Sequence, residues 1–189
     1  MKIDIVAFDG MDELDAIGPL EVLRRGGFDV QLVGLEDRVR CANGLNLMTD
    51  GRPRSDADLV VFPGGGWTNR APEGAWAEAA SNRWTKTIDD AARRGAMLGS
   101  VCTGAMILAS AGMLKGRRAT THHGAWADLE ESGASLVKER VVDDGDRITA
   151  AGVTSGIDLG LHLVERFQGA EAAATIAREL EYRAPTSAC

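Results

Sequence analysis

Short apolar segments with strand character alternate along this chain with longer segments of helical periodicity. Apolar residues 3–8 precede a helical pattern over 12–25, and a second strand pattern follows over 28–35. Strands that alternate with helices fold most readily into a parallel sheet whose two faces those helices cover. The alternation therefore predicts an α/β fold with a mostly parallel central sheet.

The rest of the chain continues the same alternation. The dipeptides Asn43-Gly44 and Asp144-Gly145 are hairpin turn signals and predict antiparallel pairs around them. Pro19 is expected to begin, bend or bound the first helix. No repeat or linker interrupts the pattern, so residues 1–189 are expected to form one domain. Further strands are expected over 58–62, 97–101, 119–121, 137–142 and 147–150, and further helices over 73–94, 103–112, 125–131, 155–167 and 171–182.

Charge and cysteine content argue against several classes of function. The net charge is −7 and the pI about 5.0, whereas binding to nucleic acid phosphates needs clustered Lys and Arg. No apolar stretch approaches the roughly 20 residues of a membrane helix, and the first one, interrupted by Asp4, is too short for a signal peptide. The cysteines Cys41, Cys102 and Cys189 are too few for a disulfide framework or a zinc site. We therefore expect a cytoplasmic protein with no metal, membrane or nucleic acid partner.

Cys102 stands where a strand pattern changes into a helical pattern. The run 97–101 stops at this cysteine, Gly104 follows two places later, and residues 105–108 have helical spacing. Such a sharp strand-to-helix turn is typical of a nucleophile elbow, which raises a reactive side chain above a sheet. A helix N-terminus also favours the thiolate through its dipole and its unpaired N–H groups. The alternative interpretation is a buried structural cysteine, because free cysteines are among the most buried residues.

Three other segments are expected beside the elbow, because open α/β sheets place their sites at the carboxyl ends of the strands. One contains Asp15, one is the glycine loop 63–66, and one carries His122 and His123. Asp15 could be an ordinary loop carboxylate and the glycines a plain turn; alternatively, the glycine amides stabilise a developing negative charge. Adjacent histidines on an extended segment point to opposite faces, so only one is expected to face the site. A metal site built from His122, Cys102 and Asp15 has no recognised ligand spacing.

Motifs in five segments, taken in order, resemble the ThiJ/PfpI superfamily, and within it the isocyanide hydratase-like group. They are Leu-Asp-x-x-Gly-Pro at 14–19, Phe-Pro-Gly-Gly at 62–65, Ser-Val-Cys-Thr-Gly at 100–104, Gly-Arg-Arg-Ala-Thr-Thr-His at 116–122 and Ala-Gly-Val-Thr-Ser-Gly-Ile-Asp at 151–158. The resemblance extends over about residues 2–182. It implies a flavodoxin-like three-layer sandwich, of the type 1 glutamine amidotransferase-like kind, with a strained elbow and a homodimeric assembly.

The resemblance also assigns roles to individual residues. Cys102 matches the nucleophile, and Asp15 matches the carboxylate that hydrogen-bonds the cysteine and moves protons. Gly65 and Thr103 match the residues whose backbone N–H groups form an anion pocket, and the Thr103 side chain matches a threonine of the hydratase group. His122 matches a histidine near the pocket.

Two positions depart from the related patterns. The protease-like branch has a histidine directly after the cysteine; here Thr103 stands there, which argues against peptide hydrolysis. The hydratase group has an aromatic residue after Thr-Thr-His; here it is His123, which changes the pocket and adds a titrating group. Trp67 follows the glycine loop and could wall the pocket, whereas Cys41 and Cys189 are expected to have no catalytic role.

Residues and resemblance together predict a lyase that needs no cofactor and acts on a small molecule. Cys102 would attack the terminal carbon of an isocyanide, R–N≡C, Asp15 would deliver a proton, and water would release an N-substituted formamide. A thiolate beside Asp15 would raise the pKa of that carboxyl and keep a proton available. Two alternatives remain open: a glyoxalase- or deglycase-like reaction on small carbonyls, and a non-enzymatic ligand- or redox-sensing domain in which Cys102 is the responsive group.

Overall fold

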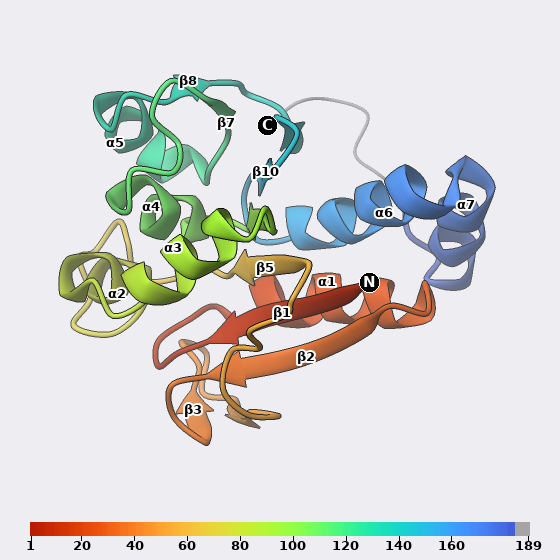
Figure 1. Cartoon of the computed structure of the whole chain (residues 1–189), viewed down its shortest axis with the longest axis horizontal. Coiled ribbons are helices and arrows are strands. Elements are labelled where there is room, and N and C mark those ends of the chain that lie inside the picture. The colour runs from red at the N-terminus through yellow and green to blue at the C-terminus, as the bar shows by residue number, and fades with distance from the viewer. Residues whose placement is uncertain (184–189) are drawn as a thin grey trace.

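A six-stranded sheet forms the centre of the molecule, with strands in the order β2-β1-β5-β6-β10-β9. Figure 1 shows β2, β1 and β5 side by side. The computed structural model describes residues 1–183. Neighbouring strands are parallel except β10 and β9, which run antiparallel. The predicted α/β fold with a mostly parallel sheet is confirmed. The strands of this sheet are β1 (Lys2–Ala7), β2 (Asp29–Gly34), β5 (Leu59–Phe62), β6 (Met97–Ser100), β9 (Val141–Asp143) and β10 (Arg147–Ala150).

Helices cover both faces of this sheet and make the outer layers of a flavodoxin-like sandwich. One layer contains α1, α6 and α7, with α1 packed on β1 and β2 and α6 on β10. The other contains α2, α3 and α4, and Figure 1 shows α2 and α4 on the opposite side of the molecule from α7. No helix among residues 1–183 is long and apolar enough to cross a membrane. The helices are α1 (Glu13–Arg25), α2 (Ala75–Ser81), α3 (Thr85–Arg93), α4 (Gly104–Ser110), the 3₁₀ turn η1 (His123–Ala125), α5 (Trp126–Glu131), α6 (Ser155–Gln168) and α7 (Ala170–Glu179).

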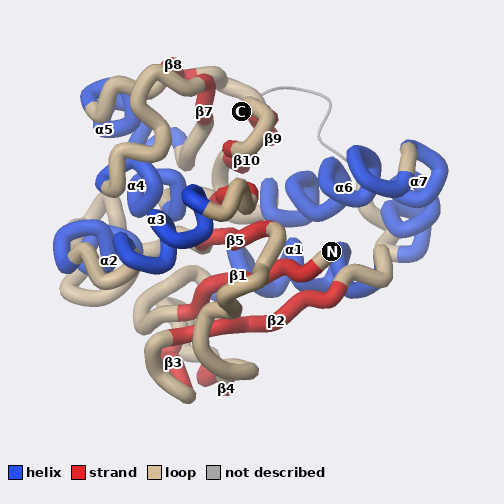
Figure 2. The backbone as a smooth tube through the Cα atoms, in the orientation of Figure 1, coloured by secondary structure: helices blue, strands red, loops and turns tan. Residues whose placement is uncertain are grey.

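Both hairpin predictions are confirmed, but the strand expected over 137–142 is mostly wrong. The short strands β3 (Arg38–Arg40) and β4 (Asn46–Met48) pair antiparallel apart from the main sheet (Figure 2). The β9–β10 pair likewise encloses Asp144-Gly145. Residues 137–140 leave the sheet, because the N–H of Val137 bonds to the carbonyl of Ala119 beside the small β7 (Arg118–Ala119) and β8 (Ser135–Leu136) pair.

The single helix expected over 73–94 is two helices. Asn82 ends α2 in the left-handed conformation, with φ at 55°, which asparagine tolerates better than most residues. The break lets Trp84 turn into the core, where it is 1% exposed and packs edge-on against Phe62. Its indole N–H donates to the buried carboxylate of Glu78 at 2.8 Å. Burial of one large aromatic side chain therefore overrides the local helical pattern.

Pro19 lies inside α1 and not at its boundary. A proline has no N–H to donate to the carbonyl four residues earlier, which here belongs to Asp15. The two helices α1 and α6 cross closely at this point, since a Cβ at Gly156 would lie 2.9 Å from Pro19 Cδ. This close packing fixes the start of α1, which carries the candidate acid Asp15, against α6.

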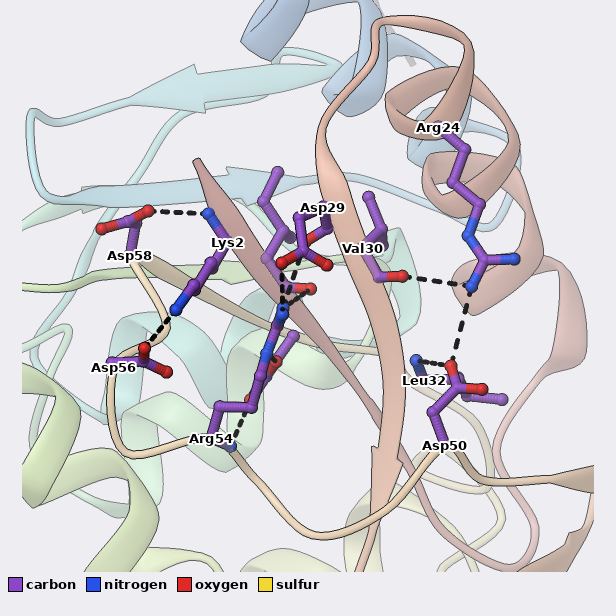
Figure 3. Close-up of polar contacts among 11 residues, drawn as sticks. Lys2, Arg24, Asp29, Val30, Leu32, Asp50, Arg54, Asp56 and Asp58 are labelled. Carbon is purple, nitrogen blue, oxygen red and sulfur yellow. Dashed lines mark hydrogen bonds and ion pairs between the residues drawn. The ribbon is translucent and has the colours of Figure 1, made fainter.

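A buried ion pair ties the segment before β5 to the first strand. Asp4 of β1 is fully buried and accepts hydrogen bonds from the Nε of Arg54 at 2.6 Å and from its backbone N–H at 2.7 Å. Arg54 also contacts Asp29 at 3.0 Å, at the start of β2 (Figure 3). One guanidinium group therefore neutralises a carboxylate inside the sheet and joins two neighbouring strands.

Candidate active site

Cys102 occupies a strained turn between β6 and α4. Its φ is +55°, a left-handed conformation that costs a residue with a side chain about 1 kcal/mol or more and persists only where its surroundings enforce it. Gly104 makes the turn possible, because a Cβ there would lie 2.0 Å from the carbonyl oxygen of Phe62. The predicted strained strand-to-helix elbow is confirmed.

Hydrogen bonds from later parts of the chain hold the elbow in this conformation. The N–H of Cys102 donates to the carbonyl oxygens of Ala150 at 3.1 Å and Ala151 at 2.7 Å. The hydroxyl of Thr121 donates to the Cys102 carbonyl at 2.9 Å. Both backbone polar groups of the strained cysteine are therefore satisfied by residues that follow it by 19 to 49 positions.

Asp15 lies beside the cysteine, as the resemblance implied. Its side chain is fully buried, and its Oδ2 accepts a hydrogen bond from the N–H of Gly64 at 2.7 Å. Its Oδ1 has no hydrogen-bond partner among the described residues. Burial raises the pKa of the Asp15 carboxyl well above its usual range, against the N–H of Gly64 and the neighbouring Cys102 thiol, which both lower it. A raised pKa favours the protonated form of this carboxyl, which can then give a proton to a reacting group.

The thiol is less acidic than its place at a helix start suggested. Burial raises the pKa of Cys102, and the charge of Asp15 raises it further, while the backbone N–H of Thr103 lowers it. The side chain is only 6% exposed, so desolvation outweighs the effect of the helix terminus. The two acids are coupled, because a second negative charge is disfavoured once one is present. When Asp15 holds the shared proton, its charge no longer opposes the thiolate.

Gly65 and Thr103 do not form the pair of free amides that the resemblance implied. The N–H of Gly65 donates to the Thr103 hydroxyl at 2.9 Å and is therefore occupied. The N–H of Thr103 instead faces the sulfur of Cys102, where it favours the thiolate. Gly65 thus acts by orienting the threonine side chain, and Thr103 supplies the amide.

Replacing Gly64 by alanine is expected to displace the elbow. A Cβ at Gly64 would lie 2.4 Å from the N of Thr103, 2.6 Å from its hydroxyl oxygen and 3.0 Å from Asp15 Oδ2. We expect slower alkylation of Cys102 by iodoacetamide and a lower Tm. Gly18→Ala is the matched control, because the nearest atom to its Cβ would be at an ordinary 3.4 Å; equal behaviour of the two variants would contradict the close approach.

A pocket of about 180 Å³ opens beside the elbow. Thr121 and Ala151, which hold the Cys102 backbone, belong to its wall, together with His122, His123 and Trp126. Lys138 lies over the Trp126 ring at 4.5 Å on the same side. The side chains of Cys102 and Asp15 do not line this pocket; it adjoins the elbow through Thr121 and Ala151.

The two histidines do not point to opposite faces, as an extended segment would require. Their ring centroids lie 4.1 Å apart and both rings line the pocket, because the chain turns into η1 at His123. The Nδ1 of His122 accepts the N–H of Gly124 at 3.1 Å, so the neutral ring carries its proton on Nε2. Burial lowers the pKa of His122, and His123 lowers it further. His122 is therefore a neutral donor at the pocket.

The sequence profile of the DJ-1/PfpI family matches residues 1–166. The chain belongs to the DJ-1/PfpI family. It is 33% identical to the isonitrile hydratase of Pseudomonas putida over 96% of this chain and 78% of that protein. It is also 33% identical to the transcriptional regulator CdhR of Pseudomonas aeruginosa, over 91% of this chain but only 51% of the regulator. A ThiJ/PfpI family protein from Pseudomonas syringae has the same fold, with a TM-score of 0.84 and 32% identity over 98% of this chain and 77% of that one.

Other relatives of this DJ-1/PfpI chain carry the names DJ-1alpha and deglycase. The family therefore includes proteins that are named as enzymes. Isonitrile and isocyanide are two names for the same functional group. The fold places Asp15, the glycine loop and Cys102 after the carboxyl ends of the neighbouring strands β1, β5 and β6, as the sequence predicted.

Other candidate residues of this DJ-1/PfpI protein lie away from the pocket. The indole N–H of Trp67 donates to Asp128 at 2.5 Å and its ring packs against Trp76, so Trp67 does not wall the pocket. Cys41 is buried after β3, where burial raises its pKa to about 11. Cys189 lies outside the described residues. Within residues 1–183 no group of three or more His, Cys, Asp or Glu is arranged to hold a metal ion.

Sequence reasoning missed three residues that build the site. The sequence places Gly64 in a glycine loop without a role of its own, yet its N–H donates to Asp15. Thr121 and Ala151 hold the elbow through its backbone. Thr121 and Ala151 lie within the motifs that carried the resemblance, but nothing local in the sequence indicates which atom of Cys102 they bind.

Proposed function

We propose that this protein adds water to isocyanides and releases N-substituted formamides. The observation that carries the proposal is a buried carboxyl with a raised pKa beside a cysteine on a strained elbow, with threonine and not histidine next in the chain. The 33% identity to a protein named isonitrile hydratase supports the same reaction. The chemistry needs no cofactor.

The first step forms a carbon–sulfur bond. The Cys102 thiolate attacks the terminal carbon of R–N≡C, and the proton of Asp15 passes to that carbon, which gives the thioimidate R–N=CH–S-Cys. The negative charge that left the sulfur now lies on Asp15. The N–H of Thr103 faces the sulfur and stabilises it before attack and after release.

The second step consumes water. The Asp15 carboxylate accepts a proton from water as the oxygen adds to the same carbon, and it passes that proton to the nitrogen. The adduct R–NH–CH(OH)–S-Cys then expels the thiolate while Asp15 takes the hydroxyl proton, which leaves R–NH–CHO and restores the starting state of the pair. The pocket beside the elbow would hold the R group against Trp126 and the histidine rings.

The deciding experiment is incubation of the protein with a simple aryl isocyanide while formamide formation is followed. Turnover that is lost when Cys102 is blocked by iodoacetamide would support the proposal. A parallel incubation with methylglyoxal tests the glyoxalase-like alternative. Lactate in that arm, with no formamide from any isocyanide, would overturn the hydratase assignment; peroxide-responsive Cys102 with neither product would favour the redox sensor.

Replacing Asp15 by asparagine is expected to remove most of the activity and leave the fold intact. The amide keeps a carbonyl oxygen for the Gly64 N–H but cannot deliver a proton, and general acid–base groups contribute roughly 100- to 10,000-fold. Formamide formation and the Tm would be measured together. Unchanged turnover would exclude Asp15 from proton transfer.

We also propose a homodimer, as the resemblance implied. Leu14 and Ile17 of α1 are 39% and 37% exposed, and apolar side chains on a helix face favour burial against another surface. Light scattering on the purified protein tests this, and a monomeric mass across micromolar concentrations would contradict it.

A further inference from the structure

The first turn of α1 has the residue spacing of a capping box but a different set of hydrogen bonds. Asp12 is the N-cap and Asp15 is the third residue of the helix. In a capping box the acidic side chain at that third position reaches back to the N–H of the cap. Here the N–H of Asp12 donates to the Gly64 carbonyl at 2.9 Å, and the N–H of Gly64 donates to Asp15 at 2.7 Å. Gly64 thus replaces the direct contact, and the Asp15 carboxyl turns away from its own helix start.

The side chain of Asp12 remains without a positive partner. Its Oδ1 accepts the N–H of Leu14 at 3.1 Å, which is a normal cap. Across residues 1–183 it takes part in no ion pair, whereas the neighbouring Glu13 is held by the backbone and side-chain N–H groups of Asn43. A single uncompensated carboxylate therefore lies one helical turn before Asp15.

We propose that Asp12 is a positioning residue for the Cys102–Asp15 pair, whose cap directs Asp15 toward the elbow and whose negative charge keeps one proton on the pair. This goes beyond the hydratase assignment: it rests on the pairing of Cys102 with Asp15 and not on the identity of the substrate. Burial is the largest cause of the raised pKa of both Asp15 and Cys102, and the charge of Asp12 raises both pKa values further. The pKa of Asp12 is itself raised by burial and by the charge of Glu13, and the charges of Asp12, Glu13 and Asp9 also act on Cys41.

The test is the pH dependence of Cys102 alkylation by iodoacetamide, with Cys102→Ala supplying the background from other cysteines. Asp12→Asn keeps an oxygen for the cap and removes the charge. We expect its half-maximal rate about 0.5 pH unit or more below that of the wild type, because removal of a nearby negative charge lowers both pKa values. The plateau rate at high pH should stay within about two-fold, because the thiolate itself is unchanged. Glu13→Gln removes an equal charge from the same turn and is expected to leave the profile in place.

Two further variants separate the cap from the charge. Asp12→Ala removes both, so its profile should differ from that of Asp12→Asn as well as from that of the wild type, and its Tm should be lower. Asp12→Ser restores a capping oxygen, so it should recover the Tm and the profile of Asp12→Asn but not the wild-type midpoint. An Asp12→Asn profile that superimposes on the wild type would overturn the proposal. So would an equal shift in Glu13→Gln, which would mean that only total charge matters. Because alkylation uses no isocyanide, failure of the hydratase assay would leave this result standing.

Discussion

Replacing Cys102 by alanine is expected to abolish formamide formation, with a loss of about 1,000-fold or more, because the covalent step has no other nucleophile. The hydroxyl of the neighbouring Thr103 already accepts the N–H of Gly65 at 2.9 Å, and a neutral hydroxyl is a poor nucleophile without a base. The measurement is the initial rate of formamide release from an aryl isocyanide at saturating concentration.

The fold of this variant should survive, which makes the loss interpretable. Alanine bears the left-handed φ of +55° no worse than cysteine does, and the hydrogen bonds to Ala150, Ala151 and Thr121 use only the backbone. A Tm close to that of the wild type is therefore expected. Cys102→Ser is the closer steric match and should also be inactive. Full activity in either variant would remove covalent catalysis from the mechanism.

Replacing Arg54 by methionine is expected to lower the free energy of unfolding by about 3 kcal/mol, because it leaves the buried Asp4 carboxylate without its counter-charge. Of the hydrogen bonds that Arg54 gives to Asp4, the variant keeps only the one from the backbone N–H. The side chain of Asp4 is fully buried, whereas that of Arg54 is 15% exposed, so water can replace the guanidinium only in part. Urea unfolding at pH 7 measures the loss.

The pH dependence of this loss identifies its cause. Burial already raises the pKa of Asp4 in the intact protein, against three contributions from Arg54 that lower it, and removal of Arg54 raises it further. A carboxyl whose folded pKa is raised contributes stability below its unfolded pKa and loses that contribution as the pH rises through the folded value. The deficit of Arg54→Met should therefore be full at pH 7 and shrink toward pH 4.

A double variant tests whether the unpaired charge of Asp4 causes the loss of stability. Asp4→Asn with Arg54→Met removes the charge together with its partner, so much of the stability lost in Arg54→Met should return. If the double variant were as unstable as Arg54→Met at pH 7, the packing of the arginine stem and not the orphaned charge would explain the loss.

Local patterns predicted the parts of this molecule that local physics decides. The apolar run of β5, the Asn43-Gly44 turn and the change of period at Cys102 each depend on neighbours in sequence, and each was confirmed. The prediction of a single helix over 73–94 was wrong because Trp84 is buried in a core that distant residues build. The prediction that His122 and His123 point to opposite faces was wrong for a related reason. The strand before them ends at Ala119, and the following turn brings both rings to one side.

The acid–base properties of the site lay beyond the sequence for a different reason. The helix start at Cys102 indicated an acidic thiol, but burial acts in the opposite sense and depends on everything packed around the elbow. The occupied N–H of Gly65 is likewise a matter of tertiary distance, since its acceptor lies 38 positions later. Residue types identify the participants, and only the packed chain decides which of their atoms are free.

The hydrogen bonds that hold the Cys102 backbone also set an order of events during synthesis. Chains emerge from the ribosome N-terminus first, so β6 and the cysteine exist well before Ala150 and Ala151, which accept the Cys102 N–H. Until β10 is made and pairs with β6, nothing on that side enforces the left-handed turn. A nascent chain that stalls before residue 150 would thus lack both acceptors of the Cys102 N–H, and the turn that positions the thiol would not be enforced from that side.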